Sequence, residues 1–139
     1  MEPPALAAML LLLAPCAALG GSPSQALDIP VEEWRAMASG RTVTYRIDGD
    51  LWALEHYFRG TDRVQLQLHD GTCLDGTWDY QAPHYCFHWG GQGTSCFRHA
   101  RIGSAIVVIQ TEAGVDTPLM QDVTAVSDAP LACGPAATS

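Results

Sequence analysis

The sequence predicts an all-β fold with one short N-terminal helix, in which an antiparallel meander forms a small barrel or an open sandwich. Two observations predict it. From Arg41 onward, apolar and polar residues alternate with a period of two, as in strands that bury one face. Turn signals rich in Gly and Asp separate these runs. About seven or eight short strands joined in this way favour a meander.

Residues 28–40 are predicted to form the helix. A proline lies in its first turn, two glutamates follow at the end where the helix dipole favours acids, and Gly40 can take the left-handed conformation that ends a helix. Val31, Trp34 and Ala38 share one face. We therefore expect Trp34 to anchor the helix against the rest of the domain.

The strands are expected to be half buried, with one face toward the core. In one run, Trp52 and Leu54 occupy one face, and Ala53 and Glu55 occupy the other. The predicted strands before the C-terminal region are residues 42–47, 52–58, 63–68, 77–80, 85–89 and 94–99.

Two further strands are expected near the C-terminus. The apolar run at residues 104–110 is predicted to be the most buried strand, since it lacks the alternation of a half-exposed one. Residues 115–126 are ambiguous because Pro118 cannot donate a hydrogen bond to a neighbouring strand. We expect them to form an edge strand or a broken one.

The first 26 residues are predicted to form a signal peptide. Residues 5–19 are almost all apolar and uncharged, and they are shorter than the ~20 residues that span a bilayer comfortably. The sequence SQA at residues 24–26 suits a signal peptidase, so the mature chain is expected to begin at Leu27. An alternative is a lipidated N-terminus at Cys16. We expect a periplasmic or secreted protein with no membrane span in the mature chain.

The mature chain is expected to be a single domain at residues 27–133, followed by a flexible tail at residues 134–139. Four cysteines remain after the leader, and an even number in a small exported domain predicts two disulfides. If the glycine turn between two strands centres near residue 91, Cys86 lies opposite Cys96. In that pairing Cys73 bonds Cys133; the rival pairing joins Cys73 to Cys86.

Net charge and motifs disfavour several functions. The charge is −8, and all seven basic residues are arginines scattered along the chain, so neither a nucleic-acid backbone nor an anionic membrane is an expected partner. The chain has no Gly-x-Ser-x-Gly motif and no phosphate-binding loop. We expect no cofactor and no enzymatic activity, and a small hydrolase using Asp75 and Asp79 is retained only as an alternative.

The aromatic residues suggest a binding function. A small barrel can hold one apolar ligand at its mouth, or it can present Trp and Tyr side chains to a partner protein of the envelope. We therefore predict a non-enzymatic binding or interaction module whose partner is a small apolar ligand or an envelope protein. The candidate ligand-binding residues are Trp52, Trp78, Tyr80 and Trp89.

A copper or zinc site is the main alternative, with His84, His88 and His99 as ligands. His84 and His88 share one strand face with Cys86, but a bridged cysteine cannot ligate a metal. The two histidines are also ~13 Å apart along the strand, too far to touch one ion without a sharp bend. The metal hypothesis therefore depends on histidines brought together from different strands.

Short motifs resemble a group of exported proteins. They are GTC at residues 71–73, GTW at residues 76–78, and a Cys-Phe pair at each of residues 86–87 and 96–97, all after SGRT at residues 39–42. Over about residues 28–100 the chain resembles small exported domains of unknown function found in alphaproteobacteria. The resemblance implies export and disulfides, and it implies no ligand or activity.

Overall fold

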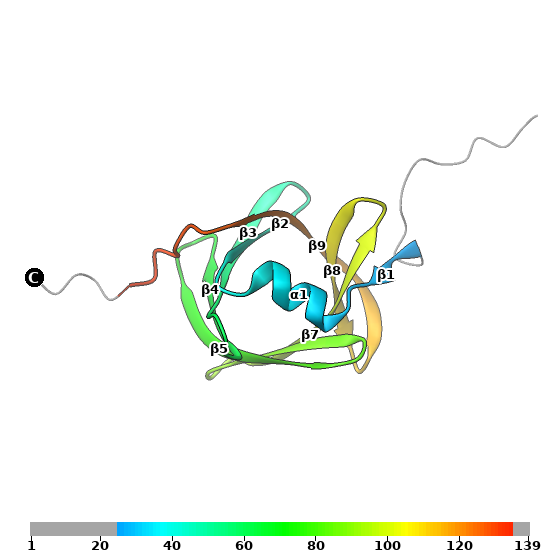
Figure 1. Cartoon of the computed structure of the whole chain (residues 1–139), viewed down its shortest axis with the longest axis horizontal. Helices are drawn as coiled ribbons and strands as arrows, with labels where there is room; N and C mark the ends of the chain where they lie inside the picture. Colours follow the sequence, from blue (N-terminus) through cyan, green and yellow to red (C-terminus); the bar gives the residue numbers. More distant parts are fainter. Residues whose placement is uncertain (1–24, 135–139) are drawn as a thin grey trace, which may run out of the picture.

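The computed structural model of the protein describes residues 25–134, which form a closed antiparallel β-barrel with one helix and one additional short strand (Figure 1). Eight strands pair in sequence order, and the last pairs with the first to close the barrel. This confirms the predicted meander and selects the barrel. The elements are β1 (Leu27–Asp28), α1 (Val31–Ala38), β2 (Thr42–Ile47), β3 (Asp50–Tyr57), β4 (Arg63–Leu68), β5 (Cys73–Gln81), β6 (His84–Trp89), β7 (Gly93–Ile102), β8 (Ala105–Glu112) and β9 (Val115–Ser127).

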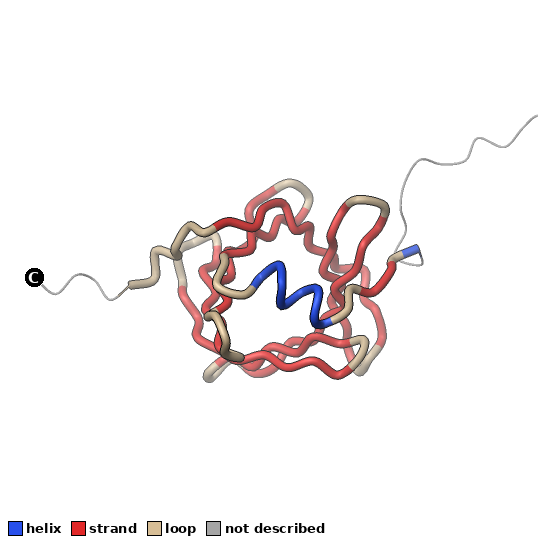
Figure 2. The backbone as a smooth tube through the Cα atoms, in the orientation of Figure 1, coloured by secondary structure: helices blue, strands red, loops and turns tan. Residues whose placement is uncertain are grey.

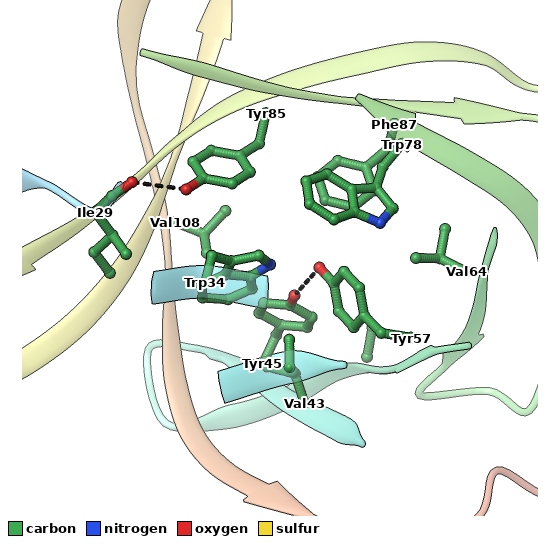
Figure 3. Close-up of a cluster of buried hydrophobic side chains, with 12 residues drawn as sticks. Ile29, Trp34, Val43, Tyr45, Tyr57, Val64, Trp78, Tyr85, Phe87 and Val108 are labelled. Carbon is green, nitrogen blue, oxygen red and sulfur yellow. Dashed lines mark hydrogen bonds between the residues drawn. The ribbon is translucent and has the colours of Figure 1, made fainter. Parts of the chain in front are cut away.

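Helix α1 lies across one end of the barrel, inside the ring of strands seen in Figure 2. It follows Pro30 and ends before Gly40, whose φ of 73° suits a glycine at a helix C-terminus. Trp34 is fully buried and points into the barrel, where its ring contacts Tyr57 and Tyr85 at centroid distances of 6.0 Å (Figure 3). The predicted anchoring role of Trp34 is confirmed.

The other end of the barrel is formed by the hairpin turns at residues 48–49, 69–72 and 90–92, whereas the turn at residues 113–114 folds back over the outer wall, where Gly114 lies near His84. We call this end the mouth. Because α1 occupies the opposite end, the inward side chains near the mouth are not covered by any helix of the described residues. The fold therefore leaves one end of its interior available to solvent.

A β-bulge sets which face of β3 points inward. Ile47 pairs with Asp50 next to the turn, but Tyr45 pairs with Ala53, so the register shifts by one residue. This shift turns Ala53 and Glu55 toward the interior, although the opposite face of β3 is the more apolar one. Trp52 is the inserted residue and lies at the mouth, 37% exposed.

Strand β9 is continuous and pairs on both sides, so the prediction of an edge or broken strand at residues 115–126 is wrong in part. Only its second half, from Asp122 to Ser127, pairs with β2. Pro118 lies in the first half, at an irregularity in the pairing with β8. The proline is tolerated because this stretch has no second partner strand that requires its missing donor.

Strand β8 is buried on both faces, as predicted. Val108 points inward, whereas Val107 and Ile109 point outward and are covered by Ala100 and Met120 together with neighbouring apolar residues. This outer cluster lies beside β1, which pairs with β7 through Asp28 and Ala100. The segment before α1 is thus held against the barrel wall.

Both disulfides of the favoured pairing are confirmed. Cys86 and Cys96 face each other on β6 and β7 with a Cα–Cα distance of 4.1 Å, and Cys73 bonds Cys133 at 5.9 Å. The second bond ties the segment after β9 to the start of β5. Ala132 N also donates to the side chain of Gln67 at 2.9 Å, so the segment up to Cys133 is held beside β4 and β5.

Several sequence predictions fall outside the described residues. These are residues 1–24 of the predicted signal peptide, with Cys16 among them, and residues 135–139 of the predicted tail. Between residues 25 and 134, no helix has the length and apolar character needed to cross a membrane.

Candidate functional site

The barrel interior contains a cavity of about 340 Å³ that opens at the mouth. Its walls come from inward residues of β2, β3, β4, β6, β7, β8 and β9, and most of them are aromatic or aliphatic. The lining residues are Tyr45, Ile47, Trp52, Glu55, Leu66, Phe87, Trp89, Ser95, Phe97, His99, Val108, Gln110, Leu119 and Gln121.

Two of the four predicted ligand-binding residues line this cavity. Trp52 reaches it from the bulge in β3, and Trp89 reaches it from the end of β6. The Trp89 ring lies against Gly76 of β5, where a Cβ atom would come within 2.6 Å of the ring. A glycine is therefore needed at this position for Trp89 to occupy its place in the wall.

The other two predicted residues, Trp78 and Tyr80, belong to the core near α1 and do not line the cavity. Trp78 is 3% exposed, and the Arg35 guanidinium of α1 lies 4.5 Å from its ring centroid. Tyr80 packs on Tyr85 with a centroid distance of 4.6 Å. Trp78 therefore contacts the helix, and Tyr80 contributes to the packing between β5 and β6.

A buried carboxyl group lies in the cavity wall. Glu55 is 4% exposed, and its Oε1 accepts hydrogen bonds from the hydroxyls of Tyr45 at 2.7 Å and Tyr57 at 2.6 Å. These two hydroxyls are themselves 3.3 Å apart, as drawn in Figure 3. No group of the described residues donates a hydrogen bond to Oε2. One carboxyl oxygen is thus held in place by the protein, and the other has no protein donor.

Burial raises the pKa of Glu55 from its ordinary value of 4.5 to about 7, and the two tyrosine hydroxyls lower it again only in part. Burial and the adjacent carboxylate raise the pKa values of Tyr45 and Tyr57 well above 10. Both hydroxyls therefore remain protonated at neutral pH and continue to donate. Near neutral pH, Glu55 exchanges between its acid and its carboxylate form.

His99 forms the inner end of the cavity, toward α1. Its ring stacks on Tyr85 at 3.9 Å and meets the edge of Trp34 at 4.1 Å. Both ring nitrogens are buried without a hydrogen-bond partner among the described residues, and burial lowers the pKa of His99 to about 3. His99 is consequently neutral across the physiological range.

Three polar side chains complete the lining: Ser95, Gln110 and Gln121. Gln121 is 8% exposed, and neither glutamine forms a side-chain hydrogen bond with another described residue that would occupy its amide. The cavity is therefore mainly apolar, with a few neutral amide and hydroxyl groups and one ionisable carboxyl.

The three predicted metal ligands are not brought together. His99 points into the barrel, whereas His84 and His88 lie on the outer face of β6, opposite Arg98 and Thr94. His88 uses both ring nitrogens, with Asp79 at 2.5 Å and Thr94 at 2.9 Å. Within residues 25–134, no group of three or more His, Cys, Asp or Glu side chains is placed to hold a metal ion.

The predicted acid pair for a hydrolase also lies outside the cavity. Asp79 bonds His88 on the outer wall, and Asp75 accepts a hydrogen bond from Gln65 at 3.1 Å. Neither aspartate lines the cavity. The carboxyl group that does so is Glu55, which the sequence reasoning did not select.

Sequence reasoning selected Trp52, Trp89 and His99 and missed the rest of the lining, including its polar residues Tyr45, Glu55, Ser95, Gln110 and Gln121. One signal was available, because Glu55 alternates with Ala53 and Tyr57 on a face that can be buried. Comparison of the chain with protein-family models, curated proteins and solved structures found no match. The geometry of the cavity is therefore the basis for assigning a function.

Proposed function

We propose that the protein is an exported binding protein that holds a small apolar molecule in the open end of its barrel. The observation that carries this proposal is the cavity of about 340 Å³, open at the mouth and lined mainly by aromatic and aliphatic side chains. Its size is within the range of small-molecule sites, on the order of 300 to 1,000 Å³. A few polar groups in an apolar wall are typical of such sites.

The cost of keeping this space supports the proposal. Eight-stranded barrels can fill their interiors with side chains, and an unfilled void in a core reduces stability. Here the end under α1 is filled by Trp34, Tyr57 and Tyr85, whereas the end at the mouth is not. Trp52 and Leu119 also remain 37% and 42% exposed at the mouth. A bound apolar molecule would cover these side chains and fill the space.

Export is supported by the two intramolecular disulfides, which are typical of periplasmic and extracellular proteins. It is also supported by the apolar segment at residues 5–19. In such a compartment a closed barrel can shield an apolar molecule from water. We regard a small molecule as the partner, rather than a protein, because the apolar surface is concave.

The test is to fill the cavity with a larger side chain. Ser95 lines the cavity, so Ser95→Phe should reduce the affinity for a neutral apolar probe such as octanol by at least about tenfold in calorimetry. Ser104 is exposed in the turn after β7, and Ser104→Phe is the matched control that should bind as the wild type does. Equal octanol affinity in both variants, or no octanol binding by the wild type, would contradict the proposal.

A second candidate function is acid–base catalysis by Glu55. A carboxyl group whose pKa is about 7 can accept and return a proton at neutral pH, and Glu55 lies in the cavity wall. Bound molecules extracted from the protein distinguish the two functions. Binding alone returns them unchanged, whereas catalysis returns a product that Glu55→Gln protein does not form.

A further inference from the structure

We infer that the molecule bound in the barrel is an amphiphilic amine, whose protonated nitrogen donates to Oε2 of Glu55 while its apolar part lies between the aromatic walls. This inference rests on the proposed function and specifies the class of ligand. Four features of the described residues support it: the acceptor geometry of Glu55, the lack of a protein cation beside it, the aromatic lining and the charge at the mouth.

The first feature is the arrangement of donors around Glu55. Two neutral hydroxyls donate to Oε1, at 2.7 Å from Tyr45 and 2.6 Å from Tyr57, and this favours the carboxylate form. Oε2 receives no hydrogen bond from the described residues. A carboxylate oxygen can only accept hydrogen bonds, and its strongest donors are cationic N–H groups. The open position on Glu55 therefore fits a protonated amine.

The second feature is that no cationic side chain among residues 25–134 pairs with this buried acid. The cavity lining contains neither Arg nor Lys. Arg35, Arg41 and Arg101 form ion pairs with acids at the outer surface near α1, and Arg98 pairs with Asp28 and Asp116. A buried charge without a partner is costly, so a ligand cation would gain from meeting it.

The third feature is the wall around the acid. The aromatic residues that line the cavity beside Tyr45 are Trp52, Phe87, Trp89 and Phe97. The Phe87 ring packs against those of Trp89 and Phe97, with centroid distances of 5.9 and 5.8 Å. Aromatic faces attract both alkyl chains and cationic nitrogen, whereas they give no such attraction to an anion. This lining favours an amine over a carboxylic acid of the same length.

The fourth feature is the distribution of charge along the barrel axis. The hairpins at the mouth carry the acids Asp48, Asp50 and Asp70. None of these three takes part in the ion pairs found among the described residues, whereas most arginines near α1 have acidic partners. Arg46 lies in one of these hairpins and donates to the Gly49 carbonyl, but three acids against one arginine, together with a net charge of −8, still leave the cavity entrance negative and attractive to cations.

The pH dependence of binding follows from the groups that face Glu55. Tyr45 of β2 and Tyr57 of β3 face Glu55. Both tyrosines keep their protons at neutral pH because their pKa values are raised. The inward residues of β4, Val64 and Leu66, do not titrate. His99 stays neutral above its pKa of about 3. Glu55 is then the lining group that changes charge near neutral pH, so amine affinity should rise as the pH rises through about 7.

Three probes with the same chain test the inference by calorimetry: octylamine, octanol and octanoate, from about pH 5.5 to about pH 8.5. At the upper pH we expect octylamine to bind at least about tenfold more tightly than octanol, and octanoate more weakly than either. The preference for octylamine should shrink at the lower pH. If octanol and octylamine bind with equal affinity at every pH, the inference is overturned while the proposed function stands. If none of the three binds, both are overturned.

Glu55→Gln identifies the recognition group. We expect this variant to lose the preference for octylamine and to keep its affinity for octanol, which also verifies that the barrel is folded. The matched control is Glu112→Gln, which removes an exposed acid and should keep the preference at about 0.15 M salt. If octylamine preference survives in Glu55→Gln, or if both variants lose it equally, Glu55 is not the group that binds the amine.

Discussion

Tyr57 donates its hydroxyl hydrogen to Oε1 of Glu55 at 2.6 Å, and the two residues are neighbours on the inward face of β3. Tyr57 belongs to the core that fills the end under α1, whereas Glu55 lines the cavity. This arrangement connects the packing of the core to the chemistry of the cavity. The ionisation of Glu55 and its hydrogen bond to Tyr57 can therefore be measured in the protein without a ligand.

Glu55→Gln should stabilise the protein above neutral pH. The unfolded carboxyl ionises near 4.5 and the folded one near 7, so the free energy of unfolding contributed by Glu55 falls as pH rises through this window. When Glu55 is fully ionised in the folded protein, the free energy of unfolding is lower by about 3 kcal/mol than at acidic pH. Urea unfolding should show equal stability of variant and wild type below about pH 4.5, and a more stable variant above about pH 7. Glu112→Gln, at an exposed acid, should show no such divergence.

Tyr57→Phe should raise the pKa of Glu55 further. The variant removes one of the two donors that favour the carboxylate. The titration of the Glu55 Cδ resonance in ¹³C-labelled protein measures this shift. Tyr85→Phe is the matched control, because the Tyr85 hydroxyl donates to the Ile29 carbonyl and not to Glu55. An unchanged Glu55 titration in Tyr57→Phe would show that the hydrogen bond is absent in solution.

His99→Phe should make the protein more resistant to acid. Unfolded histidine binds a proton near 6.5, whereas folded His99 does so only near 3, so the native state loses stability as pH falls through this window. Phenylalanine can keep the contacts with Trp34 and Tyr85 without titrating. As the pH falls from about 6.5 to about 4, urea unfolding should show that the free energy of unfolding of the variant increasingly exceeds that of the wild type. His69→Phe, at an exposed turn, should give no advantage that grows in the same way.

The two disulfides should contribute unequally to stability. The bond between Cys73 and Cys133 closes a loop with a sequence separation of 60, and the bond between Cys86 and Cys96 one of 10. Because a disulfide reduces the chain entropy of the unfolded state, replacing both cysteines of the first pair by Ala should lower the free energy of unfolding by about 4 kcal/mol. The same change in the second pair should lower it by about 3 kcal/mol. Chemical denaturation of the two double variants measures the difference. The reverse order would show that contacts in the folded state, rather than loop length, decide the effect.

The sequence predicted most of the fold because the signals for it are local. Alternation in β2 and β4, the turn residues, and the register that places Cys86 opposite Cys96 all depend on residues a few positions apart. The helix was also predictable, since Gly40 and Trp34 carry its end and its buried face within one segment. Closure of the barrel by β9 and β2 depends on residues distant in sequence, so the choice between barrel and sandwich stayed open.

The site was harder to predict because it depends on one bulge. Without the register shift between Tyr45 and Arg46, the turn at residues 48–49 would place Trp52 opposite Tyr45 and turn Glu55 away from the interior. The alternation of apolar residues in β3 predicts the register without the bulge, with Trp52 opposite Tyr45. The observed register differs from this prediction by one residue. Trp52 and Trp89, predicted as ligand-binding residues because a small barrel can hold an apolar ligand at its mouth, do line the cavity, and their part in binding stays a prediction.

The most direct test of the binding proposal is an NMR measurement of octylamine bound to the wild-type protein near pH 8. We predict intermolecular nuclear Overhauser effects between the octyl chain and the side chains of Phe87, Trp89 and Phe97, which line the cavity. Contacts restricted to residues on the outer wall, or no saturable contacts, would contradict the assignment of the barrel interior as the binding site.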